Sequence, residues 1–92
     1  MSSAPESPHL SGRHRDTLRQ IFEHPVSHNI EWHAVVSLLE AVGTVTRRHD
    51  GKVDVSVGAG QAFIDPPSGK DIDPQTVVDL RHMLADAGYQ PA

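Results

Sequence analysis

The stretch TVTRRHDGKVDVSV, Thr44 to Val57, predicts a β-hairpin and decides the fold. Its second half alternates strictly between apolar and polar side chains, which is typical of a strand with one buried face. The apolar positions are Val53, Val55 and Val57. Residues 44–49 are the expected partner strand, so the rest of the chain must supply the cover for one face of a sheet.

Asp50 and Gly51 separate the two segments and are the pair favoured in a two-residue type I′ turn. That turn would place His49 opposite Lys52 and would sort the side chains onto two faces. One face would carry His49, Lys52, Arg47 and Asp54, and the other Val53, Val55, Val57 and Thr46. A bulged three-residue loop would shift this pairing by one position.

Two helices are predicted before the hairpin. The first covers residues 13–24. Ser11 or Gly12 marks its start, and Pro25 stops it. The second follows a cap at Asn29 and ends at Gly43. Their apolar side chains recur at helical spacing and form one stripe on each helix. These stripes are Leu18, Ile21 and Phe22 in the first helix, and Trp32, Val35, Val36 and Leu39 in the second.

A third strand and a third helix complete the predicted order. Gly58 to Gly60 forms a turn, and residues 61–65 form a short strand that ends before two prolines. Asp73 then caps a helix with Pro74 at its first position. We therefore predict an α+β fold of order α-α-β-β-β-α, a small two-layer sandwich in which helices cover one face of a three-stranded antiparallel sheet.

The composition fits one small domain. The chain has 92 residues, which we divide into a flexible tail at 1–11 and a single domain at 12–90. It has no cysteine, so disulfides, thiolate zinc sites and a cysteine nucleophile are excluded. No apolar run approaches the roughly 20 residues that span a bilayer, and no signal peptide is recognisable. We expect a cytoplasmic protein that does not associate with membranes.

The stretch GKDIDPQTVVDLRHMLADAGY, Gly69 to Tyr89, resembles the C-terminal block of the HicA family of bacterial toxins. The likeness extends over residues 30–89, because LLEAVG at 38–43 and the hairpin that follows also match the family's first helix and strands. The resemblance implies a fold similar to double-stranded RNA-binding domains, an mRNA-cleaving activity that depends on a histidine of the second strand, and inhibition by a HicB antitoxin.

Val53 occupies the position at which the family carries this histidine, and a shift by one residue offers only Asp54. His49 precedes the turn and is the candidate general base that the hairpin still provides, since an imidazole suits proton transfer near neutral pH. Ribonuclease activity is therefore doubtful for this chain.

The candidate nucleic-acid-binding residues are Arg47, Arg48, Lys52 and Lys70. The formal net charge of −4 opposes this role, because affinity for phosphate backbones comes from clustered basic residues. Two functions are left open: a HicA-like RNA-binding domain with RNA and a HicB-like antitoxin as partners, or a non-catalytic protein-interaction module that uses its sheet edge or its acidic last helix.

A metal site is also conceivable, because His24, His28 and His33 are spaced by four and five residues. Pro25 interrupts the helix that would align them, and no familiar ligand pattern is completed. We therefore expect neither a metal nor a cofactor.

Overall fold

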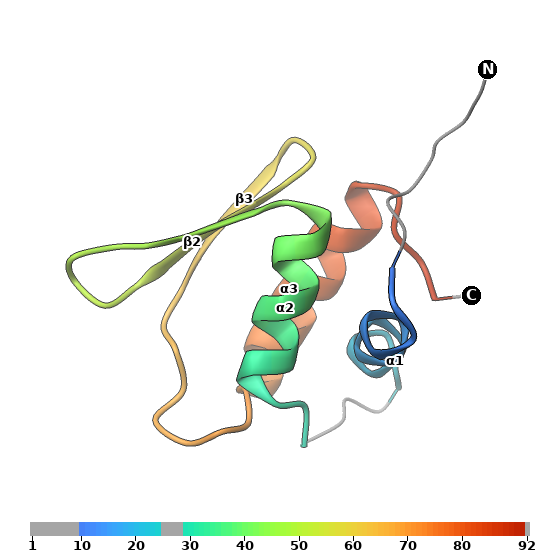
Figure 1. Ribbon diagram of the computed structural model, residues 1–92, viewed down its shortest axis with the longest axis horizontal. Helices are drawn as coiled ribbons and strands as arrows, with labels where there is room; N and C mark the ends of the chain where they lie inside the picture. Colours follow the sequence, from blue (N-terminus) through green and yellow to red (C-terminus); the bar gives the residue numbers. More distant parts are fainter. Residues whose placement is uncertain (1–9, 25–28, 92) are drawn as a thin grey trace.

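The computed structural model describes residues 10–24 and 29–91, and it has the predicted order of elements (Figure 1). Most of the predicted tail and His28 lie outside the described residues. The elements are α1 (Gly12–Ile21), α2 (Trp32–Val42), β1 (Thr44–Arg47), β2 (Val53–Val57), β3 (Gly60–Ile64) and α3 (Pro74–Asp86). The α+β prediction is confirmed.

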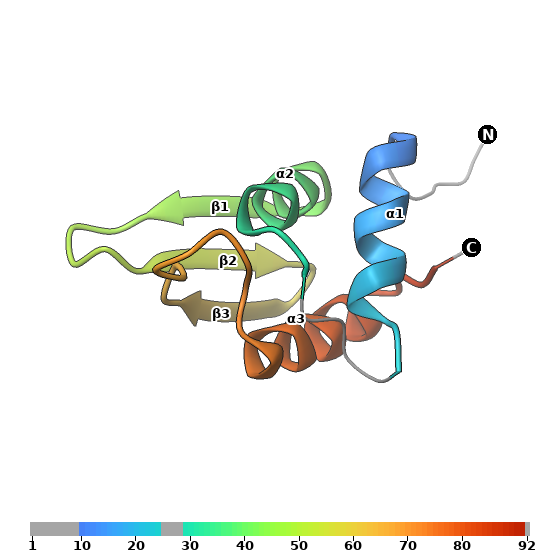
Figure 2. The ribbon, with the colours of Figure 1, turned by 90° about the horizontal axis from the view of Figure 1, so that it is seen from below.

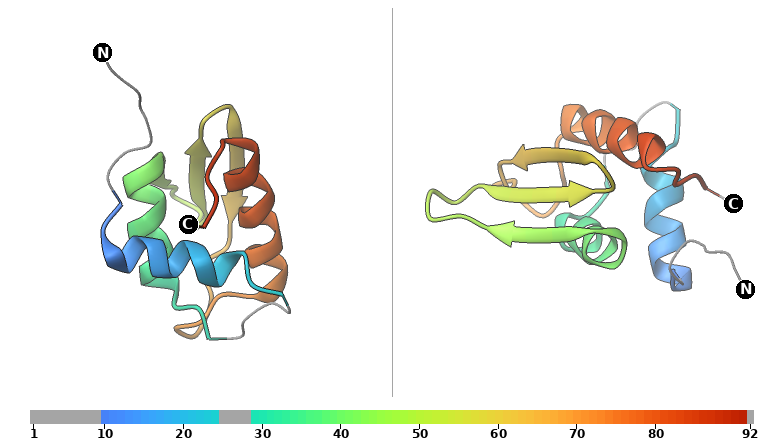
Figure 3. Two further views of the ribbon diagram at one scale, coloured as in Figure 1. Left: turned by 90° about the vertical axis from the view of Figure 1, so that its right-hand side faces the viewer. Right: turned by 90° about the horizontal axis from the view of Figure 1, so that it is seen from above.

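The sheet is antiparallel, in the order β1-β2-β3, and α2 and α3 cover one of its faces. Figures 2 and 3 show that α1 crosses α2 and α3 on their side away from the sheet. The same views show the β1–β2 loop projecting beyond all three helices. No helix or strand of residues 10–24 and 29–91 therefore covers the second face of the sheet, as the sequence predicts.

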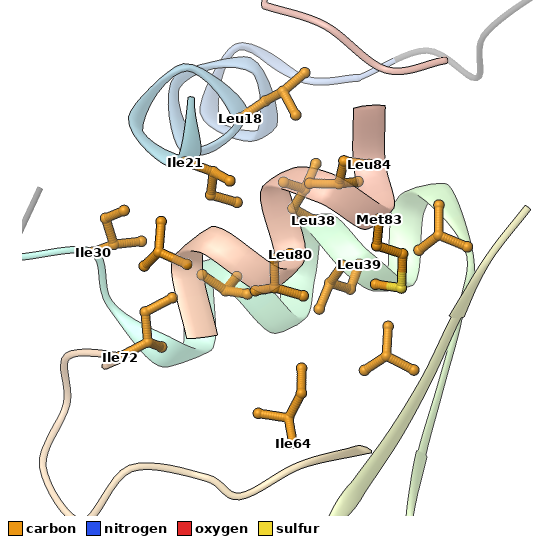
Figure 4. Packing of buried hydrophobic residues seen from close by; sticks show 14 of the residues in the cluster. Leu18, Ile21, Ile30, Leu38, Leu39, Ile64, Ile72, Leu80, Met83 and Leu84 are labelled. Carbon is orange, nitrogen blue, oxygen red and sulfur yellow. The ribbon is translucent and has the colours of Figure 1, made fainter. Parts of the chain in front are cut away.

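The core lies between the sheet and the helices. Val53, Val55 and Val57 are all buried, so the alternation in β2 is confirmed. Figure 4 shows the side chains of α2 and α3 meeting at the centre, with Leu18 and Ile21 of α1 above them. Fully burying one such aliphatic side chain contributes about 1.5–3 kcal/mol to the stability of the fold. By adding Leu18 and Ile21, α1 enlarges the core of a small domain.

The predicted caps of α1 and α3 are present, but the cap predicted for α2 is wrong. Ser11 accepts a hydrogen bond from the backbone N–H of His14, and Asp73 accepts one from Gln75. In α2 the N-cap is Glu31 and not Asn29. Backbone pairing takes the place of the side-chain cap, because the Trp32 N–H donates to the carbonyl of Lys70 at 2.7 Å.

Arg81 of α3 ties the end of α1 to the domain. Its Nε donates to the carbonyl of Ile21 at 2.9 Å, and a terminal nitrogen donates to the carbonyl of Glu23 at 3.0 Å. Carbonyls at a helix C-terminus lack partners within the helix and carry a partial negative charge. The guanidinium of Arg81 therefore supplies hydrogen-bond donors to these carbonyls and a positive charge beside their partial negative charge. Both interactions hold α1 against α3.

The predicted register of the hairpin is wrong by one residue. Arg47 pairs with Val53 and Thr46 with Asp54, because the loop contains three residues, 49–51. Gly51 has a φ of +89°, its N–H donates to the carbonyl of Arg48, and no described residue other than glycine has a positive φ. A type I′ turn needs positive φ at Asp50 as well, whereas a type I turn followed by one left-handed glycine does not. Arg47 therefore shares the face of the valines, and Thr46 lies on the uncovered face.

We predict that Gly43→Ala lowers the free energy of unfolding by about 3 kcal/mol. Gly43 ends α2, and a Cβ there would overlap the carbonyl oxygen of Ser56 in β2. The helix and the strand would have to separate. Urea denaturation of both proteins measures the difference.

Gly69→Ala is the matched control, since a Cβ at Gly69 would meet nothing within 4 Å. We expect its midpoint of unfolding to match the wild type. Equal stability of the two variants would show that the approach of α2 to β2 is looser than described.

Candidate functional site

The uncovered face of the sheet, called the open face below, is the candidate functional site. The observed register assigns to it the side chains of alternate residues in each strand and in the adjoining turns. They are Thr44, Thr46, Arg48, Lys52, Asp54, Ser56, Gln61, Phe63 and Asp65. The face is thus mostly polar, with a single aromatic ring.

Phe63 is the feature that distinguishes the open face. It is 55% exposed and is the one large apolar side chain exposed among the described residues. The guanidinium carbon of Arg48 lies 5.1 Å from the centre of its ring, within the range of a cation–π contact. The pair joins β3 to the far end of β1 across the central strand, and it presents a flat surface of mixed apolar and cationic character.

The sequence identifies Phe63 as the one aromatic residue of the strands but not its contact with Arg48. The phase of β3 could have indicated its exposure, because Ile64 is buried and neighbouring residues of a strand point to opposite faces. The contact itself depends on the register of β1 and β2, and the predicted turn gave a register that is wrong by one residue.

The basic side chains of the open face are paired with carboxylates. The Lys52 ammonium donates to Asp65 at 2.9 Å, and Arg48 lies 3.6 Å from Asp50. Asp54 accepts a hydrogen bond from the side-chain amide of Gln61 at 3.0 Å. The open face therefore carries little excess positive charge.

Asp65 raises the pKa of Lys52 above its ordinary value of 10.5, first through their hydrogen bond and then through the attraction of opposite charges. A raised pKa in the folded state means that the pair contributes to stability below the ordinary value. The contribution is lost as the pH rises through the raised pKa. Lys52 is therefore charged and paired throughout the neutral range.

The structure does not bring the four predicted nucleic-acid-binding residues together. Arg48 and Lys52 lie on the open face, whereas Arg47 shares the opposite face with Val53. Lys70 lies on the loop between β3 and α3, and its carbonyl is bonded to the start of α2. A phosphate backbone would meet two basic side chains here and not four.

The candidate base His49 is exposed in the three-residue loop. The predicted pairing of His49 with Lys52 is absent, because the backbone of Arg48 bonds to Lys52 instead, at 2.9 Å. A role for His49 in proton transfer stays a prediction.

Val53, which the HicA resemblance aligns with the family histidine, is only 2% exposed and pairs with Ile64. Its side chain belongs to the core between the sheet and the helices. A functional group at this position would be shielded from any substrate on the open face.

Residues 10–24 and 29–91 contain no group of three or more histidine, cysteine, aspartate or glutamate side chains placed to hold a metal ion. Within the same residues, every helix is too short or too polar to cross a bilayer.

No family model matches the chain, and no curated protein or solved structure matches it either. The HicA resemblance therefore stays a prediction that depends on the Gly69 to Tyr89 stretch and on the order of elements.

We predict that Val53→His lowers the free energy of unfolding by about 3 kcal/mol, because it buries a polar ring among aliphatic side chains. We also expect no cleavage of total cellular RNA by this variant. Urea denaturation and gel electrophoresis of RNA after incubation measure the two effects.

Thr46→His is the control for stability, because it places the same ring on the exposed face opposite Asp54. We expect it to unfold at the wild-type urea concentration. RNA cleavage by Val53→His would contradict the burial of this position and would restore the catalytic interpretation.

Proposed function

We propose that this protein is a HicA-like, non-catalytic interaction module that binds a protein partner through the open face. The exposed Phe63 ring with Arg48 stacked on it is the single observation that supports this function best. Aromatic and arginine side chains are enriched at protein interfaces, and the few residues that carry most of the binding energy are surrounded by energetically near-neutral contacts. The threonines, serine and glutamine of the open face supply such surroundings.

The charge distribution favours a protein partner over RNA. Contacts with phosphates need unpaired basic side chains, and both basic residues of the open face already lie beside carboxylates. Stacking of unpaired bases needs several aromatic rings along the path of the strand, and Phe63 is alone. The net charge of −4 acts in the same direction.

The HicA resemblance suggests what kind of partner this is. Toxins of this family are held by HicB antitoxins, so a HicB-like protein in a bacterial cytoplasm is the partner that we propose. A chain with Val53 in place of the family histidine would retain the binding surface of a toxin without its ribonuclease activity.

We predict a complex between this protein and the product of the reading frame adjacent to its gene. Phe63→Ala and Arg48→Ala should each weaken it at least about tenfold, since truncation of a hot-spot side chain costs more than about 1.4 kcal/mol. Isothermal titration calorimetry on the purified proteins measures the affinities. Arg15→Ala, which also removes one arginine but lies on α1, should bind like the wild type.

A measurement of RNA binding tests the alternative to the proposed function. Bulk cellular RNA is titrated at two ionic strengths with the wild type and with the triple alanine variant of Arg47, Arg48 and Lys52. We expect weak binding that the triple substitution does not change. Tight binding that falls steeply with salt and is lost in the triple variant would overturn the proposal in favour of an RNA-binding domain.

A further inference from the structure

A cleft runs beside the outer strand of the sheet. Its volume is about 350 Å³, and it lies between β3 and the first half of α3. Phe63 and Asp65 line it from the strand, and Asp73, Thr76 and Asp79 line it from the helix side. Figure 2 shows α3 beside β3.

Among the described residues, no strand pairs with the outer edge of β3. β3 is an edge strand, since the sheet order is β1-β2-β3. The bond from the Arg48 N–H to the Lys52 carbonyl fixes the phase of the ladder. Because the bonded pairs of an antiparallel ladder alternate, Val55 then bonds to Ala62, and Gln61 and Phe63 direct their N–H and C=O groups outward. Such a row of groups is a template for another strand.

The cleft is acidic, and none of its lining residues is basic. Asp73 and Asp79 each accept a hydrogen bond from Gln75, which is uncharged. Asp65 is the lining carboxylate that has a cationic neighbour, Lys52. An occupant with a positive charge would therefore find carboxylates on both walls.

We infer that the cleft receives an extended segment of the protein partner, which adds a strand to β3 and places lysine or arginine side chains among Asp65, Asp73 and Asp79. This inference depends on the proposed function and specifies the chemistry of its partner. Strand addition supplies main-chain hydrogen bonds, and alternate side chains supply specificity. One set would continue the open face beside Phe63, while the other would enter the cleft.

A second copy of the same chain fits this edge poorly. Pairing β3 with β3 would bring two sets of the same carboxylates together, and like charges opposite one another oppose association. Pairing β3 with β1 is head-to-tail and would propagate into an open-ended assembly. A basic strand from a different protein would bond to the outward backbone groups of β3 and would place positive charge beside the carboxylates of the cleft.

The probe for this inference is a capped peptide of about seven residues that alternates lysine and valine, titrated into the full chain labelled with ¹⁵N. We expect chemical shift changes at residues 60–65 and 73–80. The same peptide with N-methyl groups on alternate residues cannot form the ladder, and a glutamate–valine peptide carries the wrong charge. Both should leave these amides unshifted.

Matched variants separate the ladder from the charge. Gln61→Pro removes an outward N–H of β3 and should weaken peptide binding more than about tenfold, whereas Arg47→Pro blunts the opposite edge and should not. Asp79→Asn keeps the acceptor for Gln75 and should weaken binding by roughly threefold, since exposed charge pairs are weak. Asp86→Asn changes a carboxylate of α3 outside the cleft and should bind like the wild type.

The outcomes also distinguish this inference from the proposed function. Absence of shifts at β3, or equal binding by Gln61→Pro, would overturn the inference. Concentration-dependent self-association through β3 without a peptide effect would do the same and would identify a second copy as the occupant. If the complex with the neighbouring gene product still depends on Phe63, the proposed function survives this result; if that complex is absent too, both are wrong.

Discussion

The left-handed conformation of Gly51 is the constraint on which the two faces of the sheet depend. With one positive φ in the loop, three residues separate the bonded pair Arg48 and Lys52, and every pair in the hairpin is set by that count. A two-residue loop would exchange the faces of all β1 side chains, because the side-chain period of a strand is two. Arg48 would then lie on the helix side and could not reach Phe63. The composition of the candidate site therefore depends on the positive φ of Gly51.

The consequences extend from the loop to the chemistry of the open face. Once Arg48 and Lys52 share this face, each lies close to an aspartate, and the tip of the hairpin no longer carries a free cationic patch. The remaining distinctive feature of the open face is Phe63, whose apolar ring is exposed and does not pack in the core. An exposed ring beside paired charges suits a partner that supplies both apolar and hydrogen-bonding groups. A phosphate backbone supplies neither an apolar surface nor donors for the aspartates.

Local patterns predicted most of the fold, and contacts between distant segments account for the parts that they missed. The alternation at Val53, Val55 and Val57 and the Asp73-Pro74 start of α3 were sufficient because each depends on neighbouring residues only. Asn29 was a plausible cap in isolation, but the loop carbonyl of Lys70 meets the start of α2 instead. The contact of Arg81 with the end of α1 spans 60 residues of sequence, so no local pattern could reveal it. For the same reason the Arg48–Phe63 pair required the correct register.

The position of Val53 bears on catalysis in a way that does not depend on how the HicA resemblance is aligned. If the family histidine corresponds to Val53, its place in this chain is within the core. If the correspondence shifts by one residue, the position falls on Asp54, which faces outward and already accepts a hydrogen bond from Gln61. A carboxylate is a far weaker general base at neutral pH than an imidazole. Neither alignment puts an imidazole on the open face of β2, so the function that we propose does not depend on the choice between them.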